Sequence, residues 1–258
     1  MDEKIENNTE NAQIDIESQP PYAKYPAFKD WIFRLVLFII GLLGLELITI
    51  IIQVIIMITN PALLDENSGL YVTGLTMMNS IRYLILIFGF VALLYPRLKV
   101  IVKKFINWKT DLIGVLAGAI LIGVTIAYNV IISQFIDIGV NNNEEAAESM
   151  IKSFPVLSIL VLGLCGPVCE EITYRYGLFG CLKKKSVILA YIATTIVFAL
   201  IHFDFTGDMK VELLNLPTYL IAGAGLCFVY HKYGFNASII AHVVNNMYAI
   251  IITLIGVQ

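Results

Sequence analysis

The chain has 258 residues, of which 58% are hydrophobic and only 14% are charged, and its formal net charge is −3. A soluble domain carries about 25% charged residues, so this composition excludes an ordinary soluble protein. No basic stretch interleaved with aromatic residues occurs, so we expect no nucleic-acid partner.

Residues 1–30 differ from the rest of the chain because they are acidic, polar and interrupted by proline. They lack the basic start and the short apolar core of a secretory signal, so we expect no cleavage here. A segment of this composition cannot bury enough apolar surface to fold by itself. We therefore predict a flexible cytoplasmic N-terminal tail over residues 1–30.

Long apolar runs occupy most of the chain after this tail. A helix needs about 20 mostly apolar residues to cross a bilayer. Seven segments qualify, at about 31–59, 70–95, 111–134, 154–181, 187–203, 212–230 and 237–256. The sequence thus predicts an all-α fold, a polytopic transmembrane helical bundle of about seven spans. The first three spans form a group of N-terminal transmembrane helices at 31–134.

The connecting loops alternate in positive charge. Lysine and arginine gather at 96–110 and 183–185, whereas the loops at 60–69 and 137–152 hold a single lysine between them. Positive charge favours the cytoplasmic side of a membrane. We therefore expect the N-terminus in the cytoplasm and the C-terminus outside. The short loops and the abundance of Ile, Asn and Lys favour a multi-pass protein of a bacterial plasma membrane.

Ionisable residues also occur inside the apolar segments, where they are costly and mark an ion pair or a functional site. Glu46 and Arg82 lie midway along the first and second spans. These spans are antiparallel and the depths match, so we expect a structural ion pair. Arg34 lies near a helix end, where its side chain can extend toward the interface.

The stretch GPVCEEITYRYG in the fourth span carries two adjacent carboxylates. The pair Gly166-Pro167 should kink or restart the helix, because proline lacks a backbone donor and clashes with the preceding turn. Glu171 and Arg175 are spaced i, i+4 for a salt bridge. Glu170, about 100° away around the helix, is left without a partner in its own helix. A carboxylate in that position is suited to proton transfer.

Two of the three histidines lie within apolar segments. His202 follows Phe198 by one turn in the fifth span, and His242 precedes Asn246 by one turn in the seventh. A single intramembrane histidine is more often a hydrogen-bonding group of the core than a catalyst. Two histidines beside two glutamates and an asparagine make a reaction site the better interpretation.

This set of side chains contains the groups needed to hydrolyse an amide without a covalent intermediate. A carboxylate and a histidine can hold and deprotonate a water molecule. A second histidine and an amide can donate hydrogen bonds to the developing oxyanion. Two histidines and a carboxylate are also a zinc-ligand set in other scaffolds. The residues alone leave both chemistries open.

Three short patterns follow one another in the apolar segments. EEITYR fits E-E-x-x-x-R, FALIH fits F-x-x-x-H and HVVNN fits H-x-x-x-N. Together they resemble the CPBP family of intramembrane proteases, which includes the type II CAAX prenyl endopeptidases and bacterial members associated with bacteriocin processing or self-immunity. The resemblance covers residues 154–256 and implies a CPBP-like catalytic transmembrane core of four helices in the C-terminal half. The first three spans match no family pattern.

The resemblance implies a role for each motif position. Glu170 would be the catalytic glutamate that activates water, and His202 would assist it. His242 and Asn246 would form the oxyanion hole.

Glu171 and Arg175 would support this site. The family has been described both as metalloproteases and as metal-independent glutamate proteases, and we expect the second, with no cofactor. The alternative is a divalent metal such as zinc held by Glu170, His202 and His242.

The depth of His242 is difficult to reconcile with this set. Glu170 and His202 lie about 13 and 17 residues from the turn at 183–185, whereas His242 lies about six residues past Asn236. At about 1.5 Å per residue, His242 should therefore lie nearer the cytoplasmic face. We expect the connection at 230–237 to dip into a water-filled cavity that opens to the cytoplasm.

The sequence thus predicts an intramembrane endopeptidase. It would hydrolyse a peptide bond in a membrane-associated protein or peptide, with a role in bacteriocin or peptide processing or in self-immunity. The first alternative is a non-catalytic membrane protein that confers immunity or acts as a scaffold. The second is a proton-coupled transporter, although the sequence has no paired repeats or matched broken helices.

Overall fold

The computed structural model describes residues 30–98, 101–102, 105 and 107–256, and every regular element within them is a helix. Among these described residues, six helices are long and apolar enough to cross a membrane, and a seventh apolar helix is shorter. The predicted all-α polytopic bundle is therefore confirmed, and the chain is a multi-pass membrane protein. The tail predicted at residues 1–30 lies outside the described residues, apart from Asp30.

The spans follow the apolar runs of the sequence closely. They are α1 (Asp30–Thr59), α2 (Tyr71–Leu94), α4 (Trp108–Ser133), the composite helix Pro155–Leu182, α9 (Val187–Leu200), α10 (Met209–Tyr233) and α11 (Phe235–Ile255). The 3₁₀ turns η1 (Pro61–Leu63) and η2 (Tyr95–Arg97) follow α1 and α2. With 14 residues, α9 is about 21 Å long, shorter than a bilayer core of about 30 Å.

The composite helix is built from α-helical and π-helical stretches. It consists of α6 (Pro155–Ser158), η3 (Ile159–Cys165), α7 (Gly166–Glu170), η4 (Glu171–Phe179) and α8 (Gly180–Leu182), of which η3 and η4 are π-helical. The sequence predicts that the helix kinks or restarts at Gly166-Pro167. The chain changes there from the π-helical η3 to the α-helical α7, but it does not leave the helical conformation, since Gly166 keeps helical φ and ψ angles. Wider π-helical turns on both sides accommodate the absence of a backbone N–H at Pro167.

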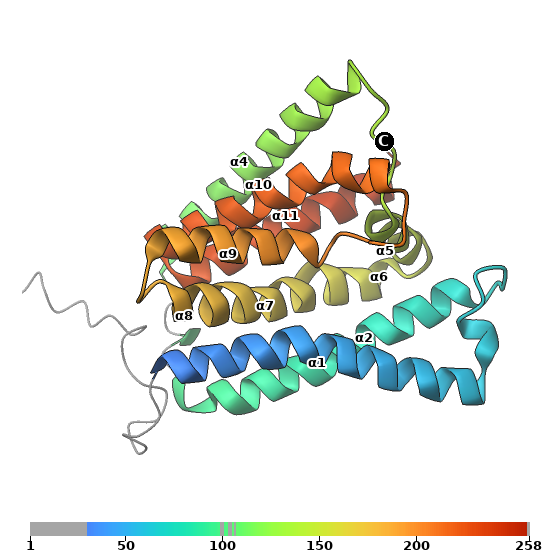
Figure 1. Cartoon of the computed structure of the whole chain (residues 1–258), viewed down its shortest axis with the longest axis horizontal. Helices are drawn as coiled ribbons and strands as arrows, with labels where there is room; N and C mark the ends of the chain where they lie inside the picture. The colour runs from blue at the N-terminus through green and yellow to red at the C-terminus, as the bar shows by residue number, and fades with distance from the viewer. Residues whose placement is uncertain (1–29, 99–100, 103–104, 106, 257–258) are drawn as a thin grey trace, which may run out of the picture.

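The composite helix lies in the middle of the bundle. Figure 1 shows α1 and α2 on one side of it and α9, α10 and α11 on the other. Every residue of η4 is buried, so this stretch forms the centre of the core. The two glutamates at the junction of α7 and η4 are thereby placed deep in the protein.

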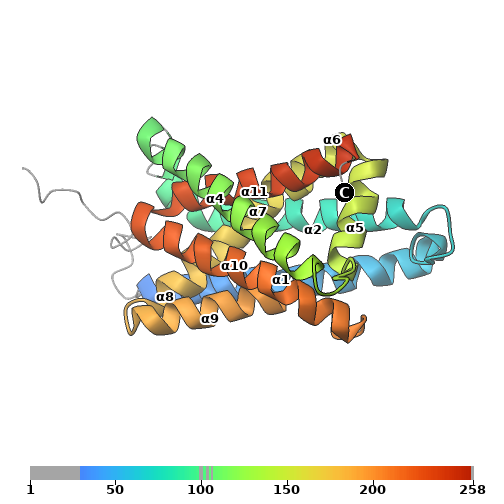
Figure 2. The same cartoon turned by 90° about the horizontal axis from the view of Figure 1, so that it is seen from above.

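Helix α4 is the outermost helix and leans away from the bundle toward its C-terminal end (Figures 1 and 2). It packs on α11 through Gly114 and Gly118. A Cβ atom at these positions would come within 2.8 Å of the carbonyl oxygens of Ala237 and Ala241, respectively. Small residues thus permit the close backbone approach that holds membrane helices together.

A cluster of charges at one end of the bundle joins α1 to its neighbours. We call it the closed cluster, and it consists of Asp30, Arg34, Arg97, Tyr176 and Lys184. Arg34 donates to Asp30 at 2.9 Å and to the Tyr176 carbonyl at 3.0 Å. Arg97 and Lys184 lie 3.3 and 2.8 Å from the Asp30 carboxylate. Arg34 is fully buried, so the expectation that it extends toward the interface is wrong.

The predicted ion pair between Glu46 and Arg82 does not form. Glu46 is exposed on the outer face of α1, among apolar side chains that are also exposed. Arg82 instead contacts Asn79 and the ring of Tyr83 on its own helix. The two residues match in depth along antiparallel helices, but they point in different directions around the helix axes.

The segment between the third and fourth spans contains a helix that we did not predict, α5 (Asn142–Ser153). Asn141 caps it by accepting a hydrogen bond from the Glu144 backbone at 2.9 Å, and Pro155 begins the next helix. Helix α5 contacts α2 and α11 at the end of the bundle opposite α8 (Figure 1). It therefore covers the space between these helices.

Candidate active site

The adjacent glutamates of the composite helix leave it in different directions. Glu171 has no exposed surface, whereas Glu170 is 8% exposed and lines a cavity. Successive helical residues are about 100° apart, which accounts for the divergence. One glutamate is therefore enclosed by protein and the other faces a space that a ligand can occupy.

Glu171 is held by three partners. Its Oε1 lies 2.9 Å from Nη1 of Arg175, as the i, i+4 spacing predicts, and 2.9 Å from Nδ1 of His242. The hydroxyl of Ser238 donates to Oε2. Because the partners of Glu171 lie on its own helix and on α11, this carboxylate fixes one helix against the other.

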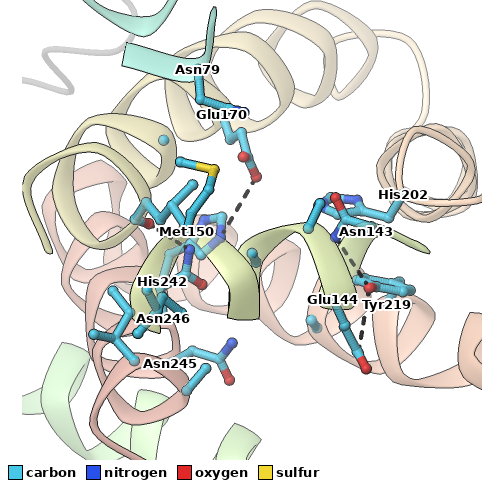
Figure 3. A pocket seen from close by; sticks show the side chains of 18 of the residues that line it. Asn79, Asn143, Glu144, Met150, Glu170, His202, Tyr219, His242, Asn245 and Asn246 are labelled. Atoms are coloured by element: carbon cyan, nitrogen blue, oxygen red, sulfur yellow. Dashed lines mark hydrogen bonds and ion pairs between the residues drawn. The ribbon is translucent and has the colours of Figure 1, made fainter. Parts of the chain in front are cut away.

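His242 bridges the two glutamates. Since an ionised carboxylate only accepts hydrogen bonds, the 2.9 Å contact with Glu171 assigns a hydrogen to Nδ1 of His242. The Nε2 atom then faces Glu170 and lies 3.7 Å from its Oε2 (Figure 3). Glu171 thus sets the orientation of the imidazole relative to Glu170.

Glu170 has fewer partners than Glu171. Its Oε1 accepts a hydrogen bond of 3.3 Å from the hydroxyl of Tyr83 on α2. Its Oε2 faces His242 and the cavity (Figure 3). The structure therefore agrees with the expectation that Glu170 is the carboxylate that Arg175 leaves free.

His202 lies just after α9 and faces the cavity from another wall. Its Nδ1 lies 2.8 Å from the Phe198 carbonyl, and its ring stacks on Tyr219 with 4.6 Å between centroids. A carbonyl accepts, so Nδ1 carries the hydrogen and Nε2 remains an acceptor. In Figure 3 His202 lies across the cavity from Glu170.

Asn246 lies one turn beyond His242 on α11 and also lines the cavity. Its Nδ2 donates to the Leu162 carbonyl at 3.0 Å, which fixes the orientation of the amide. One Nδ2 hydrogen remains after this bond. The structure thus brings Glu170, His202, His242 and Asn246 to one cavity, with Glu171 and Arg175 directly behind it.

The cavity has a volume of about 450 Å³, in the range of pockets that bind small ligands or a short stretch of peptide. It is bounded by α2, α5, η3, α7, α10 and α11 and by the end of α9. The lining includes Asn79, Arg82, Tyr83, Asn143, Glu144, Met150, Leu162, Phe198, Tyr219 and Asn245 in addition to the predicted residues.

The predicted position of this cavity is wrong. No residue of the connection at 230–237 lines it, and the α5 segment at the opposite end does. The connection does enter the protein, since Phe235, Asn236 and Ser238 at the start of α11 are buried. This burial is what brings His242 to the depth of the glutamates.

Helix α5 is tied to the cavity wall through Tyr219 of α10. The Tyr219 hydroxyl accepts from Asn141 at 3.1 Å. It also accepts from Asn143 at 3.3 Å and lies 3.4 Å from the Glu144 carboxylate (Figure 3). Glu144 keeps contact with solvent, but the protein atoms packed around it raise the pKa of its carboxyl by desolvation. The Tyr219 hydroxyl lowers the same pKa by a smaller amount.

Several residues at this site were not predicted. Ser238 precedes His242 by one helical turn, so its position on the same face of α11 was a usable signal. Asn141 and Glu144 have the spacing of a capping box, which marks a helix start. Tyr83 and Tyr219 carry no local signal, because only the packing of α2 and α10 brings them to the cavity.

The alternative of a metal held by Glu170, His202 and His242 was tested against the arrangement of the donors. Over the described ranges, no three His, Cys, Asp or Glu side chains gather closely enough to hold one ion. His242 and His202 each have Nδ1 bonded to a protein oxygen, as metal-ligating histidines also do, so these bonds favour neither chemistry. Since the three side chains are not gathered around one point in this arrangement, we derive no step through a metal, and metal independence stays a prediction.

In a comparison with known families, residues 152–248 match the model described as type II CAAX prenyl endopeptidase Rce1-like. The matched segment contains all three motifs. The sequence-based resemblance to this group of membrane proteases is thereby confirmed for residues 152–248, which make up less than half of the chain. At the level of the family, the match supports a protease.

Curated relatives are similar over less than half of this chain. A "UPF0177 protein in abiGi 5'region" of Lactococcus lactis subsp. cremoris is 29% identical over 48% of this chain and 50% of its own length. A "Putative membrane peptidase YdiL" of Bacillus subtilis is 28% identical over 44% of both chains. The alignments thus span half or less of the curated relatives' own lengths. No solved structure matches the chain significantly.

Proposed function

Since residues 152–248 match the Rce1-like model, we propose that this chain is an intramembrane endopeptidase that hydrolyses a peptide bond in a membrane-associated peptide or protein. One observation carries the proposal. A free carboxylate, two oriented histidines and an oriented amide face a single cavity that lies among membrane-spanning helices. A structural cluster has no need of such a cavity.

The proposed reaction begins with a water molecule between Glu170 and His202. Glu170 takes a proton from the water, and Nε2 of His202 orients the water by accepting its second hydrogen bond. The hydroxide attacks the carbonyl carbon of the scissile peptide bond. Glu170 then passes the proton to the leaving nitrogen, so the products are a new carboxyl terminus and a new amino terminus.

The oxygen of the scissile carbonyl becomes negative during this attack. Asn246 has one Nδ2 hydrogen left for it, and His242 offers an Nε2 hydrogen when both of its ring nitrogens are protonated. Donors fixed before the reaction stabilise such charge without reorganisation. Glu171, Arg175 and Ser238 act as positioning residues, because they hold His242 rather than contact the substrate.

The reaction is assigned to the core at 154–256. The N-terminal helices at 31–134 are not passive in this proposal, because α2 supplies Tyr83 to Glu170. With the N-terminus in the cytoplasm of a bacterial cell, as the loop charges predict, α5 and the cavity lie toward the outer face. A protease-sensitive tag inserted after Gly139 should then be cleaved by protease added outside intact cells.

The substrate in this setting is a membrane-associated peptide, such as a bacteriocin precursor or leader peptide, and the process is peptide maturation or self-protection.

We propose that no metal is required. Purified protein in proteoliposomes should therefore cleave candidate peptides equally well with and without a chelator. Loss of cleavage on chelation, restored by zinc, would favour the metal alternative instead.

Two variants separate this proposal from the non-catalytic scaffold. Glu170→Ala and His202→Ala should each reduce cleavage by about 10²–10⁴-fold while the protein still accumulates and inserts. Glu46→Gln is the matched control, because Glu46 is a span carboxylate outside the cavity, and it should remain active. A cellular phenotype that survives both cavity variants would support a scaffold.

A further inference from the structure

Arg82 lies midway along α2 and lines the same cavity as Glu170. Helix α2 precedes the segment that matches the Rce1-like model, so none of the three motifs accounts for this residue. A charged side chain in the middle of a membrane span is costly and is typically kept where it serves a substrate or an ion. Arg82 is therefore expected to act on a group inside the cavity.

Arg82 differs from every other arginine of the chain. The chain has four arginines, and the other three each bond to a buried carboxylate: Arg34, Arg97 and Arg175. Across the part of the chain that the structure describes, no Asp or Glu lies within ion-pair distance of Arg82. Its charge has no protein counterion there.

The contacts of Arg82 leave donors available. One Nη2 hydrogen bonds to Oδ1 of Asn79 at 2.5 Å, and the guanidinium lies over the Tyr83 ring, 5.1 Å from its centroid. Both partners are neutral. The Nε atom is buried and has no hydrogen-bond partner. A planar guanidinium in this state is suited to bind a carboxylate through two parallel hydrogen bonds.

Tyr83 connects this cation to the proposed reaction centre. The ring of the same tyrosine lies under the Arg82 guanidinium, and its hydroxyl donates a hydrogen bond to Glu170. Arg82 is also the one lysine or arginine among the described residues that line the cavity, whereas Glu144 and Glu170 are its acidic residues. An anionic group that enters the cavity is therefore drawn to Arg82 and away from Glu170.

We propose that Arg82 is a specificity residue that binds a carboxylate of the peptide substrate and so sets which peptide bond lies against Glu170. The inference rests on the proposed peptidase function and adds the substrate class, a peptide with a carboxylate near the scissile bond. That carboxylate is either the C-terminal carboxylate or the side chain of an aspartate or glutamate. Both present the same group to the guanidinium.

The test compares Arg82 variants on matched peptides in proteoliposomes. One cleavable peptide is made with a free C-terminus, with a C-terminal amide, and with its acidic side chains replaced by Gln or Asn. Arg82→Gln should raise KM for the carboxylate peptide about 10- to 100-fold, with a smaller change in kcat. On the peptide that lacks the recognised carboxylate, the rise in KM caused by Arg82→Gln should be at least about tenfold smaller. The peptide that shows this smaller rise thereby identifies which carboxylate Arg82 binds.

Two further variants keep the test independent of folding. Arg82→Lys keeps the charge but not the planar fork, so it should recover part of the loss. Lys109→Gln removes one positive charge at an exposed position outside the cavity and should leave the preference for the carboxylate peptide unchanged. Equal losses by Arg82→Gln on all peptides would show a merely structural role and overturn the inference.

Binding separates this inference from the proposed function. Labelled peptide can be titrated onto Glu170→Gln and onto the double variant Glu170→Gln/Arg82→Gln without turnover. Weaker binding of the carboxylate peptide to the double variant supports recognition by Arg82, even if the wild type cleaves no peptide. Equal binding of carboxylate and neutral peptides to Glu170→Gln contradicts it, even if the wild type is an active peptidase.

Discussion

Two clusters of charge in the described part of the chain differ in how completely they are satisfied. In the closed cluster, Asp30 bonds to Arg34, Arg97 and Lys184, and Tyr176 accepts from Arg34 through its carbonyl. None of these residues lines the described cavity around the glutamates. The cluster joins α1, the end of α2 and the composite helix, and it is expected to act in stability alone.

The site around the glutamates has two halves: a satisfied half, in which Glu171 is bonded on all sides, and an open half, in which Glu170 faces the cavity. Glu171 is surrounded by Arg175, His242 and Ser238, whereas Glu170 faces the cavity with its Oε2 3.7 Å from His242. Apart from the exposed Lys184, burial is similar in the two groups of charge. What distinguishes the proposed reaction site from the structural cluster is an ionisable group whose partners leave it facing a cavity.

The largest expected effect on stability comes from Asp30→Ala in the closed cluster. This change leaves the cations of Arg34 and Arg97 buried without their carboxylate, which costs about 3–5 kcal/mol of unfolding free energy. Thermal unfolding in detergent measures it, with Asp65→Ala in an exposed loop as the control. Loss of peptide cleavage without loss of stability would mean that the closed cluster also has a catalytic role.

A smaller effect, on turnover, is expected for Ser238→Ala in the satisfied half of the site. The change removes one hydrogen bond to Glu171 and loosens the orientation of His242. We expect kcat to fall about tenfold with little change in KM, and the free energy of unfolding to fall by about 1 kcal/mol. Thr253→Ala on the exposed end of α11 is a control of similar size. A large rise in KM with constant kcat would contradict a positioning role.

Tyr83→Phe should have a weaker effect in the open half. The hydroxyl of Tyr83 bonds to Glu170 at 3.3 Å, which is long for such a contact, while the ring that supports Arg82 is retained. We expect kcat to fall a few fold and the preference for a carboxylate peptide to persist. Steady-state kinetics on the free-acid and amide peptides measures both quantities, and a reversal of the preference would contradict this account.

The smallest expected effect concerns pH and the position of α5. The pKa of Glu144 is raised by desolvation, so the docked state binds its proton more tightly than a state with α5 displaced. Docking should therefore be firmest below the ordinary glutamate pKa and should weaken as pH rises through the raised value.

A spin label on α5 should accordingly become more mobile as pH rises, and Glu144→Gln should remove most of that change. A label whose mobility changes equally with pH in the wild type and in Glu144→Gln would show that another group is responsible.

The sequence sufficed to predict features that depend on local composition and spacing. The apolar runs predicted the membrane spans, and the i, i+4 spacing predicted the contact between Glu171 and Arg175. The three motifs identified the residues that meet at the cavity. These signals work because helix length and helix face are properties of a single segment.

The failures share one cause, which is that contacts between helices depend on rotation about their axes. Glu46 and Arg82 have matching depths and still face apart. Arg34 lies near a helix end but is enclosed by the composite helix and α10, through contacts with Tyr176 and Tyr230. The cavity lies under α5 because that helix folds across the bundle, which the segment's polar composition concealed.

The central claim is that Glu170 activates a water molecule in this cavity. The most direct measurement is single-turnover cleavage of a peptide in H₂¹⁸O, followed by mass spectrometry of the products. The account predicts one ¹⁸O atom in the new C-terminal carboxylate with the wild type and with Glu46→Gln, and a loss of at least about 100-fold with Glu170→Gln. Labelled product formed by Glu170→Gln at the wild-type rate would contradict it.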